Sequence, residues 1–139
     1  MKLVNKIFQI WPKRWVATAL IMFAILYLTL VPRPLPDNDI EVPGLDKVVH
    51  AVMFGALAFV AVVDLARRGR GEYAPVSRRS LLCVAAASAA TGGLIEELQM
   101  AMGAGRSGDW LDFLADAVGA AAGAWLATMA LKAWRKQRP

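Results

Sequence analysis

Four long apolar runs, separated by polar joints, most constrain how this chain can fold. They cover residues 15–31, 48–66, 81–102 and 110–131. Each is close to the roughly 20 residues that a helix needs to cross the hydrocarbon core of a bilayer. The 139 residues are 58% hydrophobic, whereas about half is typical of soluble domains. The sequence therefore predicts an all-α integral membrane four-helix bundle that forms one domain over residues 1–139.

The first apolar run has an alternative interpretation as a secretory signal peptide, because basic residues precede it. The run is long for a signal sequence, and the segment from Val31 to Pro34 is a poor cleavage site, since it lacks the small residues that signal peptidase requires. We therefore expect this run to remain in the mature protein as a membrane span.

The basic residues predict the orientation. Of the 16 lysines and arginines, 13 lie in the amino-terminal segment, the loop at 67–80 and the carboxyl-terminal tail, and only three lie in the linker at 32–47 and the turn at 103–109. Because basic loops stay in the cytoplasm, both termini are expected there, in a multi-pass protein of the inner (cytoplasmic) membrane. The five arginines of the 67–80 loop are typical of contact with anionic lipid, so no nucleic-acid partner is predicted.

Two expectations concern single residues near the ends of the spans. Trp110 and Trp134 are predicted to be anchors at opposite membrane interfaces, where tryptophan is enriched. Asp64 is predicted to pair with Arg67 or Arg68 at the cytoplasmic end of the second span.

The stretch from Gly92 to Gly123 concentrates polar residues among apolar and small ones. Burying charge is costly, especially in lipid, so this density predicts a functional role. The spacing places Glu96 and Gln99 on one helix face and the three aspartates on one face of the next helix. A glycine-rich turn joins the two helices, and a small-xxx-small pattern follows. The residues are Glu96, Glu97, Gln99, Arg106, Asp109, Asp112, Asp116, Gly119 and Gly123.

This pattern, E-x-x-Q, a short glycine-rich turn with arginine, D-x-x-D and G-x-x-x-G, resembles the VanZ-like membrane protein family. Asp46, Lys47 and His50 extend the resemblance upstream, so that it spans residues 46–123. The chain has Asp116 where the family usually has asparagine. The resemblance implies a membrane protein associated with resistance to the glycopeptide teicoplanin, but it implies no mechanism.

Depth along the helices predicts that the polar residues converge. With a rise of about 1.5 Å per residue, Glu96 and Asp116 both lie about 9 Å from the outer ends of their spans. His50, Gln99 and Asp112 lie about one helical turn or less below the same surface. We therefore expect an outward-opening polar pocket in the outer leaflet whose ligand-binding residues are Asp46, Lys47, His50, Glu96, Gln99, Arg106, Asp109, Asp112 and Asp116.

Several chemical interpretations of this pocket stay open. A hydrogen-bond network that only fixes the bundle is the structural alternative. His50 and carboxylate oxygens are chemically able to bind a divalent ion. No close spacing typical of metal motifs supports this, so neither a metal nor another cofactor is predicted. Catalysis by Ser107 and His50 is less favoured, because nothing like G-x-S-x-G surrounds the serine.

Three hypotheses for function follow. The first is a binding module for a membrane lipid headgroup or a lipid-linked cell-wall precursor. The second is an intramembrane enzyme acting on such a ligand, with His50, Glu96 and Asp112 as candidate catalytic residues. The third is a structural partner of a larger envelope complex, for which the glycines Gly119 and Gly123 would matter most.

Overall fold

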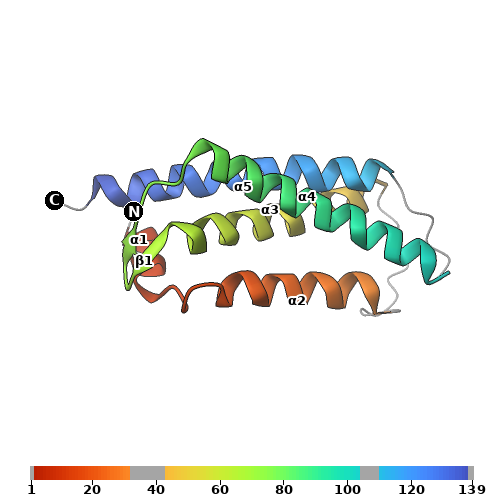
Figure 1. Cartoon of the computed structure of the whole chain (residues 1–139), viewed down its shortest axis with the longest axis horizontal. Coiled ribbons are helices and arrows are strands. Elements are labelled where there is room, and N and C mark those ends of the chain that lie inside the picture. Colours follow the sequence, from red (N-terminus) through yellow and green to blue (C-terminus); the bar gives the residue numbers. More distant parts are fainter. Residues whose placement is uncertain (1, 32–42, 104–109, 138–139) are drawn as a thin grey trace.

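The computed structural model describes residues 2–31, 43–103 and 110–137, and it is mostly helical. Four long helices lie side by side, and a short helix and a small hairpin lie at one end of them (Figure 1). In chain order the described elements are α1 (Lys2–Ile10), α2 (Val16–Leu30), α3 (Leu45–Ala66), β1 (Arg67–Gly69), β2 (Glu72–Tyr73), α4 (Arg78–Ala101) and α5 (Trp110–Lys136).

Three of these helices, α3, α4 and α5, are long and apolar enough to cross a membrane. The apolar helix α2 has 15 residues. At about 1.5 Å per residue it extends about 22 Å, which is less than the roughly 30 Å of a hydrocarbon core. The first predicted span thus becomes a shorter apolar helix. The start of the second predicted span also changes, because α3 begins at Leu45 and so includes Asp46 and Lys47.

The backbones of helices α3 and α5 come into direct contact at two glycines of α5. A Cβ atom built on Gly119 would collide with the backbone of Ala51, and one built on Gly123 would collide with the backbone of Gly55. Only glycine therefore permits this close approach, which brings α5 against α3 along the small-xxx-small pattern. The contact sets the depth at which the polar residues of the two helices meet.

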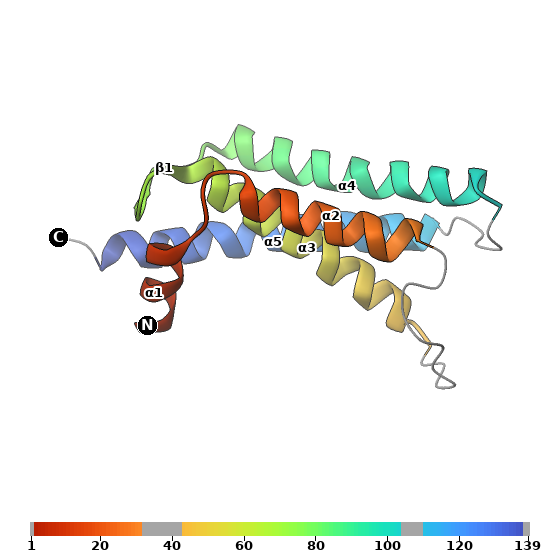
Figure 2. The ribbon, with the colours of Figure 1, turned by 90° about the horizontal axis from the view of Figure 1, so that it is seen from below.

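The short helix α1 runs across the end of the bundle, beside the hairpin and the last turns of α5 (Figure 2). The Phe8 ring lies 4.9 Å from that of Tyr73 and 5.4 Å from that of Trp134, measured between ring centroids. The Tyr73 hydroxyl donates to the Phe8 carbonyl at 2.9 Å. The prediction for Trp134 is therefore wrong, since its side chain is buried inside the protein, whereas Trp110 is exposed.

The prediction for Asp64 is also wrong. This residue is fully buried and accepts hydrogen bonds from the Trp11 indole (2.8 Å) and from the backbone N–H (3.1 Å) and hydroxyl (2.6 Å) of Thr18. Thr18 is the third residue of α2, where the backbone N–H groups have no partner within the helix. Asp64 thus caps α2 from α3, while Arg67 donates to the Trp11 carbonyl.

Candidate functional site

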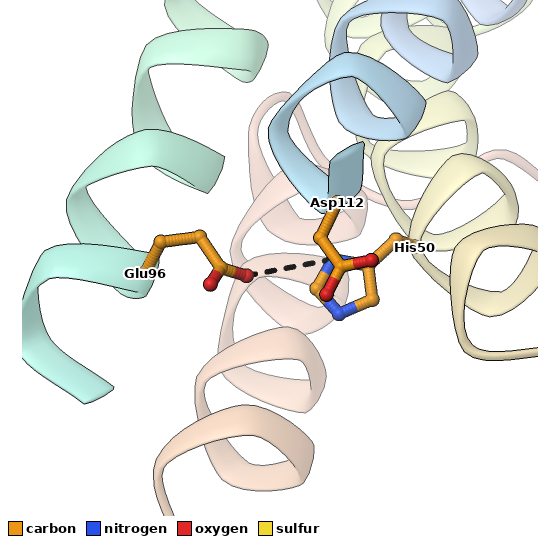
Figure 3. A group of neighbouring side chains, drawn as sticks. All are labelled: His50, Glu96 and Asp112. Carbon is orange, nitrogen blue, oxygen red and sulfur yellow. Dashed lines mark ion pairs between the residues drawn. The ribbon is translucent and has the colours of Figure 1, made fainter. Parts of the chain in front are cut away.

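A cluster of ionisable side chains lies at the end of the bundle opposite α1 and the hairpin. His50 comes from α3, Glu96 from α4, and Asp112 and Asp116 from α5. Figure 3 shows His50, Glu96 and Asp112 pointing toward one another from three different helices. We call these four residues the polar cluster. Its members are separated by up to 66 positions in the sequence, so the helix packing alone brings them together.

His50 and Asp116 form the innermost pair. The His50 Nδ1 lies 3.0 Å from the Asp116 Oδ1, and the Asp116 side chain is fully buried. A Cβ atom on Gly92 would collide with the other carboxylate oxygen, Oδ2. The missing side chain at Gly92 therefore makes room on α4 for this carboxylate. In the part of the chain that the structure describes, Oδ2 has no hydrogen-bond partner.

Glu96 and Asp112 complete the cluster around the imidazole. The Glu96 Oε1 lies 4.0 Å from the His50 Nδ1, and the Glu96 side chain is only 11% exposed. One potential ligand atom from each of His50, Glu96 and Asp112 lies within 4.8 Å of the other two. Glu97, the neighbour of Glu96, is exposed. The structure thus separates two adjacent glutamates into one inside the cluster and one outside it.

Lys47 lies at the rim of the cluster. Its Nζ is 3.2 Å from the Asp112 Oδ1 and 2.9 Å from the Asp46 Oδ2, and about a third of its side chain is exposed. Asp46 is more than half exposed, so this residue belongs to the surface around the cluster rather than to its interior. Exposed ion pairs contribute at most about 1 kcal/mol to stability, which makes a purely structural role for Lys47 weak.

Gln99 is predicted to line the pocket, but its described hydrogen bond leads elsewhere. Its Nε2 donates to the Thr29 carbonyl at 2.7 Å. Thr29 lies in the last turn of α2, where carbonyl groups have no partner within the helix. Gln99 therefore fastens the end of α2 to α4. No pattern in the sequence indicates this pair, because every helix ends in carbonyl groups that have no partner within the helix.

The remaining predicted site residues, Arg106 and Asp109, lie outside the described residues, as does Ser107. Two hollows on the described surface lie away from the polar cluster. One is lined by residues that include Leu65, Arg79 and Cys83. The other is lined by residues that include Lys132 and Arg135. The chemistry of the chain therefore centres on the cluster and its rim.

The balance of charge limits what the polar cluster can do. Among the residues that the structure describes, three carboxyl groups, those of Glu96, Asp112 and Asp116, face one imidazole, and Lys47 at the rim adds one positive charge. Buried carboxylates at this range require a shared proton or a cation. The cluster is therefore suited to proton transfer, to binding a cation, or to accepting hydrogen bonds from a ligand.

Comparisons with known proteins agree with the motif. Searches of curated proteins and of solved structures gave no match. The model of one protein family, described as VanZ/LLP1, matches residues 2–131. The match covers every element described above except the last turn of α5, and it includes all four residues of the polar cluster. The chain, with its apolar helices and their polar end, belongs to the VanZ/LLP1 family.

Proposed function

We propose that this protein lies in the cytoplasmic membrane with both termini inside, and that its polar cluster binds the headgroup of a lipid or a lipid-linked cell-envelope precursor. The observation that carries the proposal is the gathering of His50, Glu96 and Asp112 from three helices beneath a partly exposed Lys47. A network that only held the helices together would need no exposed cation at its rim.

The depth of the cluster supports a headgroup ligand. Glu96 lies five residues before Ala101, the end of α4, and Asp116 lies six residues after Trp110, the start of α5. At about 1.5 Å per residue, both are roughly 8 to 9 Å from their helix ends. A headgroup region is about 5 to 7 Å thick on each side of the hydrocarbon core, so this depth corresponds to the boundary between headgroups and acyl chains.

The side chains favour a ligand that carries both phosphate and hydroxyl groups. The Lys47 ammonium is suited to a phosphate oxygen, and the carboxylates of Glu96 and Asp112 accept hydrogen bonds from hydroxyl or ammonium groups. A sugar joined to a polyprenyl chain through phosphate has this combination, as do some phospholipid headgroups. The association with teicoplanin that the VanZ-like resemblance implies is consistent with a cell-wall precursor.

Native mass spectrometry tests the proposal. The protein, purified in mild detergent, is mixed with an undecaprenyl-linked precursor and, separately, with phosphatidylglycerol. We expect bound precursor in the wild type, and at least about tenfold weaker binding in Lys47→Met and Glu96→Gln, because a charged hydrogen bond contributes about 1.5–3 kcal/mol. Glu97→Gln is the matched control, since Glu97 is exposed and should leave binding unchanged. Equal binding by all four proteins would contradict the proposal.

The His50 and Asp116 pair favours a second candidate function, an intramembrane enzyme acting on the same class of ligand. A carboxylate on one ring nitrogen orients an imidazole so that the other nitrogen can accept a proton, as a general base requires. Product formation from the bound precursor separates the two candidates. In an enzyme, Glu96→Gln would abolish turnover while the precursor still binds, whereas a binding module would release no product in any variant.

A further inference from the structure

We propose that His50, Glu96 and Asp112 bind a divalent transition-metal ion, with Asp116 as the residue that positions His50. The ion would bind whether or not a lipid is present, so this inference goes beyond the proposed function. The first observation is geometric: three ligand atoms on three different helices lie within 4.8 Å of one another. Two of the three side chains are only 15% exposed, and that of Glu96 is 11% exposed.

The donor atoms define the class of ion. One imidazole nitrogen with two carboxylate oxygens suits Zn²⁺, a borderline ion, and also Mn²⁺, a harder ion that prefers oxygen ligands. At metal–ligand distances of about 2.0–2.2 Å, ligand atoms on a shared tetrahedral ion lie roughly 3.4 Å apart. The side chains of Glu96 and Asp112 would need to close by little more than 1 Å, which rotation about their side-chain bonds provides.

Asp116 supplies a second and independent observation. This carboxylate is fully buried and lies 3.0 Å from the His50 Nδ1, so that in the tautomer with the proton on Nδ1 the lone pair of Nε2 is left for a ligand. Metal-binding histidines commonly donate their other N–H group to a carboxylate in this way. The Asp116 Oδ2 has no partner among the described residues, and a buried carboxylate oxygen without a partner indicates positive charge or water nearby.

Lys47 does not prevent an ion from binding at Asp112. It carries one charge, which Asp46 and Asp112 share, while Glu96 and Asp116 lie deeper among the helices. Lys47 contacts the Oδ1 of Asp112, and a carboxylate has a second oxygen with which to bind an ion. A divalent ion between Glu96 and Asp112 would add positive charge among these carboxylates.

Isothermal titration calorimetry with ZnCl₂ tests this inference on the full chain, purified without a histidine tag and stripped with EDTA. We expect one Zn²⁺ per chain in the wild type. Affinity should fall at least about tenfold in Glu96→Gln and Asp112→Asn, which remove ligands, and about 10- to 100-fold in Asp116→Asn, as for other residues that orient a metal ligand. Glu97→Gln is the control and should bind like the wild type.

Each variant is first shown to have the wild-type melting temperature in the absence of metal. If Asp116→Asn does not fold, Glu96→Gln, which preserves the side-chain volume, tests the inference instead. Absence of Zn²⁺ binding to the wild type would overturn the inference, and so would equal affinities for Glu96→Gln and Glu97→Gln. Because the titration contains no lipid precursor, neither result depends on the proposed ligand.

Discussion

At the scale of single residues, Asp64 and Asp116 are both fully buried, but their surroundings differ. Asp64 receives three hydrogen bonds, from Trp11 and Thr18, so its carboxylate is satisfied by the protein. Asp116 contacts His50 through one oxygen, and its other oxygen has no partner among the described residues. Because a buried polar atom without a partner is costly, Asp64 fits a structural role and Asp116 a functional one.

The contact between Gly92 and Asp116 leads to a prediction about two adjacent glycines. Gly92→Ala should lower stability by about 1–3 kcal/mol, because the new methyl group collides with the carboxylate that holds His50. Gly93→Ala is the control: its Cβ would lie 3.4 Å from the Phe113 ring, and alanine favours the helix. Thermal unfolding in detergent measures both variants. Equal melting temperatures for the two variants would show that α4 can move away from Asp116 without a loss of stability.

The cap on α2 leads to a second prediction. Thr18→Val removes the hydroxyl that donates to the buried Asp64 carboxylate, and we expect a loss of about 1.5–3 kcal/mol because the bond involves a charged group. Thr128→Val is the matched control, since the Thr128 hydroxyl donates to the Ala124 carbonyl of its own helix. Urea or thermal unfolding would measure both. A loss at Thr128 as large as that at Thr18 would contradict this account of the cap.

The residues of the polar cluster were largely predictable from sequence, whereas the hydrogen-bond partner of the nearby Gln99 was not. Helical spacing and depth predicted that His50, Glu96, Asp112 and Asp116 converge near one surface, and the structure brings these four together. Gln99 has the same spacing, but it bonds to a backbone carbonyl 70 residues away. Partners of that kind depend on how the helices are arranged around one another, which periodicity within a helix does not specify.

At the scale of elements, apolar length predicted the long helices but not the short ones. The helix α1 has nine residues, and the hairpin strands have three and two, so neither forms an apolar run. Both are stabilised by contacts with distant residues, chiefly the rings of Phe8, Tyr73 and Trp134. Short elements that depend on such packing leave little pattern in the sequence.

The packing of α3 on α5 leads to a prediction at this scale. Gly119→Leu should force the two helices apart, because even a Cβ atom there collides with the Ala51 backbone. We expect a loss of more than about 3 kcal/mol, above the usual range for overpacking, since the obstacle is backbone rather than a side chain. Val118→Leu, at an exposed position one residue away, should change little. Similar melting temperatures for the two variants would place Gly119 outside the helix contact.

At the scale of the whole molecule, the two ends of the bundle differ in chemistry. One end gathers α1, the hairpin, the start of α4 and the last turns of α5 (Figure 1). Together with the segment between α1 and α2, these parts carry 12 of the 16 lysines and arginines, whereas the polar cluster lies at the other end. The four apolar runs correspond to the four long helices α2, α3, α4 and α5. Because successive helices run in opposite directions, the end of α5 lies on the side where α2 begins (Figure 1). The bias in basic residues predicts that this side faces the cytoplasm.

The last prediction tests this orientation by labelling single cysteines in intact cells with a maleimide that does not cross membranes. Cys83 is exposed and is first replaced by serine, which leaves a background without cysteine. Met102→Cys, at the exposed end of α4 near the polar cluster, should be labelled from outside. Arg70→Cys, on the hairpin at the opposite end, should be labelled only after the cells are permeabilised. The reverse pattern would place the cluster in the inner leaflet, where it would meet cytoplasmic headgroups and no precursor exposed on the outer face.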